Sequence, residues 1–332
     1  MLTLFEASTQ LLPFLKATSR IPVVPIVCTD NRLIAFNGEL MGIVEFEGSS
    51  TIDSWAVSGQ RLLSVLRDDS VIIIQDTRLT IKNGRFRSKL PMYPLDGVML
   101  GPMPDDVVED NWIELSSADV NAIILASKFS SENSDHAWAQ SVTLYKKNAV
   151  ATNNVSLVAV ELDNDNIFEE PLVLPSWFMP LMKPGIKLSV SGTKILFKTD
   201  YVYGYGLMLE ATPPESFLET MNNLMEKFDD LNWQHISSLR EAFNNIEMLS
   251  DRYVVFDSAV LSTKSKDDCE GEADIDWSLQ FDSVKLFKEI VDLILKNSTV
   301  ISFDQTPGRI HFARNTPRMI GIASTIRDAS CV

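Results

Sequence analysis

The feature that most constrains the fold is an internal repeat, in which a strand, a short helix and a run of strands follow one another three times. The stretch starting WAVSGQRLL enters its helix at Ser58, LVLPSWFM does so at Pro175, and LQFDSVKLF does so at Asp282. Ser and Asp are common N-cap residues, and Pro is common in the first turn of a helix. The three anchors are 117 and 107 residues apart, so the repeat predicts three similar domains.

Two proline-containing stretches between the repeats are typical of linkers. They are GPMPDD, from residue 101, and ATPPES, from residue 211. Turn-forming residues of this kind mark the ends of structured segments. The predicted domains are therefore residues 1–104, 105–212 and 213–332. The order strand, helix and strands also occurs in unrelated folds, so the repeat favours this division without excluding others.

Short runs rich in β-branched and aromatic residues, such as SVIIIQD and SLVAVEL, dominate the chain and predict strands. Helical periodicity is confined to a few short stretches. The predicted helices span residues 8–20, 58–67, 117–128, 175–182, 236–248 and 282–296. The expected fold class is α+β, rich in strands, with two helices in each of the three domains.

Cysteine usage and hydropathy indicate the cellular compartment in which the chain acts. Cys28, Cys269 and Cys331 are odd in number and far apart, which argues against a disulfide framework and fits a reducing compartment. No apolar run is long enough to span a bilayer, and the start, MLTLFEASTQ, lacks the basic region of a secretory signal. We therefore expect a cytoplasmic protein that does not use a membrane.

Residue patterns for catalysis are missing from the sequence. The three histidines stand apart, no pair of cysteines has the spacing CxxC, and no phosphate-binding loop of the form GxxxxGK[ST] occurs. The acidic run from Asp267 to Asp276 alternates as one face of a strand would. We therefore expect a protein that is not an enzyme and that uses no metal and no cofactor.

Four stretches carry a resemblance to a known family. They are LLPFLKATSRIPVVPIV, WAVSGQRLLSVLRDD with RLTIKNGRFRSKLPMYP, AVATNNVSLVAVEL, and LREAFNNIEMLSDRYVVF. In order and spacing they resemble the bacterial-type DNA sliding clamp, the beta subunit of the replicative DNA polymerase. The resemblance runs along nearly the whole chain, and its divergence suits a distant or phage-encoded clamp in a bacterial or infected host cytoplasm.

The resemblance implies an architecture and a function. Each chain would have three clamp-type domains, with sheets outside and two helices per domain inside, and two chains would join head to tail as a six-domain ring. Such a ring encircles double-stranded DNA without reading its sequence. It tethers DNA polymerase, the clamp loader and other replication proteins, and so acts as a processivity factor.

The distribution of charge fits a DNA-facing inner surface. The six predicted helical stretches, the fourth extended to residue 187, carry five more basic than acidic residues, which leaves −21 for the rest of a chain with net charge −16. Amphipathic helices often carry such residues on any solvated face. The predicted DNA-facing residues are Lys16, Arg20, Arg61, Arg67, Trp138, Lys183, Lys187, Arg240, Lys285 and Lys288. For Trp138, packing at the start of a strand is an equally good interpretation.

Two segments of opposite charge predict the contact between chains. Arg85, Arg87 and Lys89 alternate along one strand, and Glu270, Glu272, Asp274 and Asp276 alternate along another, so each set lies on one face of its strand. The resemblance places these two strands edge to edge between subunits, beside an apolar patch. Ser88 replaces the family's aromatic residue, with Phe86 nearby. The predicted dimer interface comprises Arg78, Arg85, Phe86, Arg87, Leu90, Met248, Leu249, Glu270, Glu272 and Asp274.

The resemblance also implies a groove for partner peptides between the second and third domains. Its residues would be Thr152, Asn153, Asn154, Leu157, Ile322, Ile326 and Arg327. Two departures put the preferred peptide in doubt. The family's Gly-His-Arg is here Asn154-Val155-Ser156, and the family's C-terminal Met-Pro-Met-Arg-Leu is missing.

Two alternatives remain open from the sequence. One is a non-enzymatic, β-rich repeat protein with a structural or assembly role, which would need neither localised positive charge nor a groove. The other is a clamp-like factor that binds polymerase without closing a ring. A stable dimer of twice the chain mass separates the ring from both.

Overall fold

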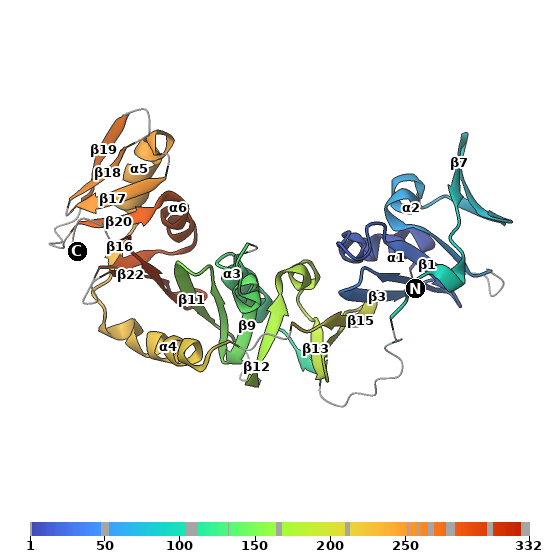
Figure 1. The fold of residues 1–332 in the computed structure, drawn as a ribbon, viewed down its shortest axis with the longest axis horizontal. Helices are drawn as coiled ribbons and strands as arrows, with labels where there is room; N and C mark the ends of the chain where they lie inside the picture. Colours follow the sequence, from blue (N-terminus) through green and yellow to red (C-terminus); the bar gives the residue numbers. More distant parts are fainter. Residues whose placement is uncertain are drawn as a thin grey trace. The chain divides into compact units, whose positions relative to one another are not determined.

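The computed structural model describes residues 2–47, 53–101, 103, 112–131, 133–163, 168–209, 213–250, 252–257, 259–264, 269–276, 283–303 and 308–326. Contacts divide the chain into two compact units. Unit 1 comprises residues 1–116 and 180–208, and unit 2 comprises residues 117–179 and 209–332. Both are built from antiparallel sheets with short helices, which confirms the α+β class (Figure 1).

Unit 1 contains an eight-stranded sheet of order β4-β1-β2-β3-β15-β14-β13-β8 and a three-stranded sheet of order β5-β6-β7. The strands of the larger sheet are β1 (Pro25–Thr29), β2 (Arg32–Phe36), β3 (Leu40–Glu45), β4 (Trp55–Ser58), β8 (Ile113–Glu114), β13 (Lys187–Ser191), β14 (Lys194–Lys198) and β15 (Val202–Leu207). The smaller sheet comprises β5 (Val71–Gln75), β6 (Arg78–Asn83) and β7 (Phe86–Pro91).

The helices of unit 1 are short. They are α1 (Leu4–Gln10), α2 (Gly59–Val65) and the 3₁₀ helices η1 (Leu12–Leu15) and η2 (Leu95–Gly97). A capping box starts α1: the Glu6 amide donates to the Thr3 hydroxyl at 3.2 Å, and the Thr3 amide donates to the Glu6 carboxylate at 2.8 Å. Buried Phe14 of η1 stacks on Phe197 of β14, with ring centroids 5.8 Å apart, so the η1 segment packs on this sheet.

Unit 2 contains an eight-stranded sheet of order β12-β9-β10-β11-β23-β22-β21-β16 and a four-stranded sheet of order β19-β18-β17-β20. The larger sheet comprises β9 (Ser141–Lys146), β10 (Asn148–Thr152), β11 (Ser156–Glu161), β12 (Phe168–Pro175), β16 (Gln234–His235), β21 (Val300–Ser302), β22 (Arg309–Arg314) and β23 (Met319–Ser324). The smaller comprises β17 (Tyr253–Asp257), β18 (Val260–Lys264), β19 (Glu270–Asp274) and β20 (Val284–Phe287).

The helices of unit 2 pack on both of its sheets. They are α3 (Ser117–Ser127), α4 (Glu215–Glu226), α5 (Ser237–Ile246) and α6 (Lys288–Asn297), with the 3₁₀ helices η4 (Ala137–Gln140), η6 (Lys227–Asp230) and η7 (Glu247–Leu249). The 3₁₀ helix η5 (Ser176–Leu181) begins in unit 2 and ends in unit 1. α3 contacts β9, β10 and β11 of the larger sheet, whereas α4 contacts β11 and β23 from the opposite side (Figure 1). α5 and α6 pack on the smaller sheet.

The strand order repeats three times, as the sequence pattern predicts. The sheets β4-β1-β2-β3, β12-β9-β10-β11 and β20-β17-β18-β19 share one order, and each fourth strand leads into a helix and then a three-stranded meander. Asp282 lies outside the described residues, and the third helix starts at Lys288 rather than there, because residues 284–287 pair with β17 as a strand. The boundaries at 104/105 and 212/213 adjoin stretches that are not described, and the three-domain division stays a prediction.

Two further expectations about helices are wrong. The first helix was expected over residues 8–20, but α1 starts at Leu4, where Thr3 caps it, and the helical segment ends at Leu15. The second error is an omission: ATPPES is typical of a linker, but its last two residues, Glu215 and Ser216, already belong to the helix α4. Its apolar residues recur every three or four positions, which is a helical signal that the prolines before it obscured.

Candidate interaction surfaces

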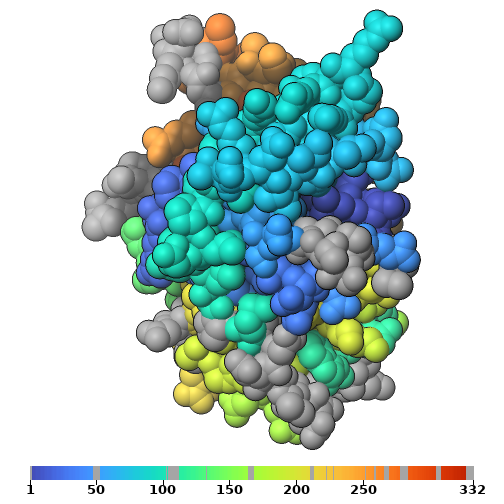
Figure 2. All heavy atoms as spheres, turned by 90° about the vertical axis from the view of Figure 1, so that its right-hand side faces the viewer, coloured from blue at the N-terminus to red at the C-terminus, as the bar shows by residue number. Residues whose placement is uncertain are grey.

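β7 is an edge strand of unit 1 with five basic residues on or beside it. It pairs with β6, and among the described residues no strand pairs with its other side. In Figure 2 the segment containing β5, β6 and β7, coloured light blue to turquoise, lies uncovered on the upper part of the face shown. The exposed basic side chains are Arg78, Lys82, Arg85, Arg87 and Lys89.

The charges on this hairpin repel one another within the chain. Lys82 lies directly opposite Arg87 in the β6–β7 ladder, and like charges in that position destabilise a sheet. Leu79 and Leu90 pair on the other face and are buried. Phe86, at the start of β7, is 54% exposed. The hairpin is therefore stabilised through one apolar face, and its basic side chains stay exposed.

β19 is an edge strand of unit 2 with the opposite charge. It pairs with β18, and the described residues provide no second partner. Glu270, Glu272 and Asp274 are exposed, and the Glu270 carboxylate lies 3.0 Å from the Lys264 ammonium. The alternation predicted from the sequence is therefore present in the strand itself. Its carboxylates outnumber the cations beside it.

An apolar patch on η7 borders β19. Met248 is 86% exposed and Leu249 is 39% exposed, both on η7. A Cβ added to Gly271 would lie 2.9 Å from Leu249 Cδ1, so Leu249 packs over β19. The predicted neighbours Met248, Leu249, Glu270 and Glu272 thus lie together on one edge of unit 2.

The sheets are joined inside the chain by a single rule. The third strand of one four-stranded set pairs with the last strand of the next meander: β3 pairs with β15, and β11 pairs with β23. β19 is the third strand of the remaining four-stranded set, and β7 is the last strand of the remaining meander. β19 and β7 are therefore the two edges that the rule leaves unjoined in the described chain.

The predicted DNA-facing residues are placed differently from the expectation. Only Arg61, Arg240 and Lys288 lie within α-helices. The predicted positive charge therefore lies only partly on the helices, which are shorter than predicted. Lys16, Arg20, Arg67 and Lys183 follow helices, while Lys187 lies on β13, Lys285 on β20 and Trp138 on η4.

Three of these cations serve the fold of their own unit. The Arg240 guanidinium donates to the Leu295 carbonyl at 2.7 and 3.1 Å, at the C-terminal end of α6. The Lys288 ammonium donates to the carbonyls of Glu247 and Ser250. The Lys285 ammonium lies 4.9 Å from the Tyr253 ring centroid. These contacts cap helix ends and cover an aromatic ring.

In unit 1 the predicted DNA-facing cations are exposed. They include Lys16, Arg20, Arg61 and Lys183. The Arg67 guanidinium donates to the carbonyls of Leu66 and Ser64. Lys187 lies 3.1 Å from the Glu114 carboxylate, so its charge is largely balanced.

Trp138 lies in an aromatic cluster. Its ring stacks on His136 at 5.6 Å and meets Phe217 of α4 at 4.9 Å between centroids. The side chain is half-buried. The structure therefore places Trp138 against α4, a contact that sequence reasoning missed because α4 itself was missed.

The predicted groove residues Thr152, Asn153 and Asn154 build a tight turn between β10 and β11. The Thr152 hydroxyl donates to the Ser156 carbonyl at 2.7 Å, and the side-chain Oδ1 of Asn153 accepts from the amides of Val155 and Ser156 at 3.1 and 2.6 Å. Asn154 has φ +69°, which Asn tolerates better than most residues. These side chains shape the backbone at one end of the candidate groove.

Leu157 and Ile322 bring the two predicted walls together. They are paired residues of β11 and β23, and both are half-buried beside α4 and the buried residues Val150 and Ile320. Ile326 is half-buried and its amide donates to the Lys285 carbonyl at 2.8 Å. Arg327 lies outside the described residues. The apolar part of the predicted groove is thus one continuous sheet face.

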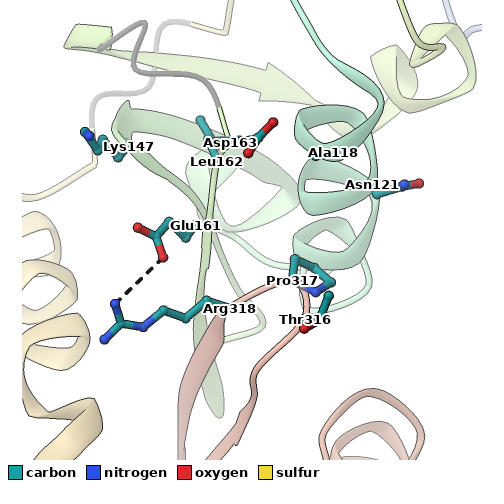
Figure 3. A pocket seen from close by; sticks show the side chains of 9 residues that line it. All are labelled: Ala118, Asn121, Lys147, Glu161, Leu162, Asp163, Thr316, Pro317 and Arg318. Carbon is teal, nitrogen blue, oxygen red and sulfur yellow. Dashed lines mark ion pairs between the residues drawn. The ribbon is translucent and has the colours of Figure 1, made fainter.

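A separate pocket of about 470 Å³ opens at the other end of β11 (Figure 3). Its charged residues are Lys147, Glu161, Asp163 and Arg318, and the dashed line in Figure 3 joins Arg318 to Glu161 at 3.9 Å. Arg318 also reaches Asp229 of η6 at 4.0 Å. Charges of both signs line this pocket, so it has no clear preference for an anion or a cation.

Metal ions and reactive thiols require particular arrangements of neighbouring side chains. No set of three His, Cys, Asp or Glu residues in the described part of the chain has the arrangement of a metal site. Burial, with a smaller contribution from Asp30, raises the pKa of the Cys28 thiol to about 12, so this thiol stays protonated at neutral pH. None of the described helices is both long and apolar enough to cross a membrane.

Comparison with known proteins identifies the fold. No family model matches the sequence, and no curated protein matches it. Among solved structures, a DNA polymerase sliding clamp from Pseudomonas aeruginosa superposes with a TM-score of 0.76 at 13% identity, covering 98% of this chain and 97% of that one. The Helicobacter pylori beta clamp has a TM-score of 0.76 at 14% identity, covering 98% of both chains.

A further structure shows the H. pylori beta clamp bound to a DNA ligase peptide, with a TM-score of 0.73 at 14% identity and 98% coverage of both chains. Coverage of nearly the whole chain means that the three repeated strand patterns all find counterparts. The resemblance seen in the sequence is thereby confirmed at the level of the fold. This chain has the fold of the bacterial DNA polymerase sliding clamps.

Proposed function

We propose that the chain is a DNA polymerase processivity factor: a non-enzymatic sliding clamp that closes head to tail with a second copy around duplex DNA. The observation that carries this proposal is the rule that joins the sheets. β3 with β15 and β11 with β23 are the internal joins, and β19 with β7 of another copy would repeat the same join. The clamp fold supplies the expectation that two copies close six domains into a ring.

The charge of the two free edges supports this pairing. The basic residues of β7 and the acidic residues of β19 are both spaced by two, so an antiparallel ladder between them sets opposite charges across from one another. Head-to-tail contacts of this kind form closed rings when the rotation between copies permits closure. A ring needs no catalytic residue, since its function is to stay threaded on DNA.

The exposed cations of unit 1 support contact with the DNA backbone. Lys16, Arg20, Arg61 and Lys183 would meet phosphates, which bind without sequence information. Arg240, Lys285 and Lys288 already bind groups within unit 2, so we expect them to contribute less. A weak, non-specific contact suits a ring that slides.

Partner recruitment is the second part of the proposal. The H. pylori clamp structure contains a DNA ligase peptide, and we propose that polymerase, loader and similar partners of this chain dock short apolar segments on the face containing Leu157 and Ile322. Apolar faces with a few half-buried anchors are usual sites for such segments. The proposed place of action is the cytoplasm of a bacterium, or of an infected host if the chain is phage-encoded.

Release from DNA ends tests the proposed function. The protein is assembled on nicked circular DNA with a loader or by opening the dimer, and bound protein is measured after gel filtration. A sliding ring stays on the circle and is lost by at least tenfold when one cut makes the DNA linear. Equal retention on circular and linear DNA would overturn the topological mechanism and favour a simple DNA-binding or assembly protein.

A further inference from the structure

α4 and η6 occupy the sheet face on which partner segments are proposed to dock. Met221 and Leu224 of α4 are buried against β11 and β23. The buried sheet residues under them are small or aliphatic and lie on β10, β11, β22 and β23. They are Val150, Ala159, Ala313 and Ile320, with Leu157 and Ile322 half-buried beside them.

α4 is amphipathic and uses one side only. Its apolar residues and that of η6 follow a spacing of three or four, which places them on one stripe. They are Phe217, Met221, Leu224, Met225 and Phe228. The opposite side carries Glu215, Ser216, Glu219, Asn223 and Glu226, all exposed. α4 therefore binds the sheet as a helical ligand binds an apolar groove.

Contacts at the two ends of this segment are accessible to solvent. At one end Phe217 meets half-buried Trp138 at 4.9 Å. At the other end the Arg318 guanidinium lies 4.9 Å from the Phe228 ring centroid and 4.0 Å from the Asp229 carboxylate, which is 87% exposed. Exposed ion pairs contribute little to stability, so the apolar stripe provides most of the attachment.

We propose that α4 is a built-in occupant of the partner surface, which a partner with aliphatic and aromatic anchors reaches by displacing α4. This inference rests on the proposed clamp function, which brings partner segments to this face. The apparent association constant of a partner equals its intrinsic value multiplied by the fraction of molecules in which α4 is undocked. α4 thus sets a threshold that weak or incomplete partner segments do not pass.

Peptide binding to a variant with α4 unseated tests the proposal. Met221→Ser with Leu224→Ser weakens the apolar stripe, and Glu219→Ser with Asn223→Ser changes the exposed side of the same helix as a control. The probes are a labelled peptide of residues 213–231 and the DNA ligase peptide of the H. pylori complex, followed by fluorescence anisotropy. Both should bind the unseated full-length variant at least tenfold more tightly than the wild type and the control.

Weaker binding of the ligase peptide to the unseated variant would make α4 a wall of the site and overturn the proposal. Equal binding of the residue 213–231 peptide to all three proteins would also overturn it. Because the unseated variant could fold poorly, amide exchange of the wild type gives an independent measurement. α4 amides should exchange at least tenfold faster than those of β11 and β23, and exchange in one common opening would contradict the proposal.

Failure of this inference is distinguishable from failure of the clamp function. Release from linearised DNA depends on ring closure and involves no peptide. If the protein is not released from linearised DNA but both peptides still bind the unseated variant more tightly, the clamp function is overturned and α4 remains a displaceable helix. If the protein is released normally but unseating α4 does not change peptide binding, the clamp function stands and the proposal that α4 occupies the partner surface is overturned.

Discussion

β7 and β19 are edge strands of similar length that differ in the sign of their charge. β7 belongs to unit 1, which has 14 basic and 16 acidic residues, whereas β19 belongs to unit 2, which has 15 basic and 29 acidic residues. β6, β7 and the turn between them expose five cations, and β19 exposes three carboxylates. The excess of acidic over basic residues therefore lies mainly in unit 2, and unit 1 is nearly balanced.

The opposite charges of the two edges disfavour pairing of either edge with its own copy. An exposed sheet edge can pair with any other edge, including its own copy. Two β7 edges or two β19 edges would bring like charges together, while β7 with β19 brings opposite charges together. The comparison therefore favours a head-to-tail contact over a symmetric one.

Reversing the basic edge should have the largest effect. Arg85→Glu with Arg87→Glu places two new carboxylates against the three carboxylates of β19 at the contact, and such repulsion costs on the order of 3 kcal/mol or more. Dimerisation should weaken at least about a hundredfold. Sedimentation velocity should show a 37.2-kDa monomer at concentrations where the wild type is a dimer.

The matched control reverses two exposed cations of unit 1 away from β7, Lys16→Glu with Lys198→Glu. It changes the net charge of the chain by the same amount, so it should leave the dimer intact. A dimer that survives the β7 reversal, with circular dichroism unchanged, would contradict the assignment of this edge. A control that also dissociates would show that net charge alone decides association.

The apolar borders of the two edges should contribute less. Phe86→Ser removes a side chain that is 54% exposed and would become buried in the contact, a loss of about 1 to 2 kcal/mol. Dimerisation should weaken about tenfold, measured by the same method. Tyr201→Ser changes a side chain that is also 54% exposed and should leave the dimer unaffected. Equal behaviour of the two variants would place Phe86 outside the contact.

Salt should have the smallest of these effects. Charges on exposed strands are screened beyond about 10 Å at 0.1 M ionic strength. Raising NaCl from 50 to 500 mM should increase the dissociation constant of the wild-type dimer a few-fold, and that of the Phe86→Ser dimer by the same factor. A dimer that tightens with salt would be held by apolar contact, and the charge comparison would then be irrelevant to assembly.

The sequence predicted the two edges well because their information is local. Alternating charges two residues apart need only a strand to lie on one face, and residues 86–91 and 270–274 are strands. Arg85 lies in the turn just before β7 and Asp276 just after β19, so these two residues fall outside the strands in which they are predicted. The threefold strand order was predictable for the same reason, since each repeat carries its own turn and apolar pattern. The pairing of β11 with β23 is not local, and the family resemblance alone suggested that Leu157 and Ile322 would meet.

The sequence failed where one residue type serves two purposes. Arg240 and Lys288 have the charge expected of a DNA contact, but they bind carbonyls at helix ends, and composition does not distinguish the two uses. α4 was missed because Pro213 and Pro214 were assigned to a linker, although Pro is common just before and at a helix start. The apolar spacing from Phe217 to Phe228 was the available signal.

Mixing two charge-reversed chains tests the head-to-tail contact most directly. One chain carries Arg85→Glu and Arg87→Glu, and the other carries Glu272→Lys and Asp274→Lys. Each alone should sediment as a 37.2-kDa monomer. An equimolar mixture should form a dimer of about 74 kDa, because both contacts in the mixed ring again join opposite charges. A mixture that stays monomeric, or single variants that remain dimers, would contradict the joining of β7 to β19.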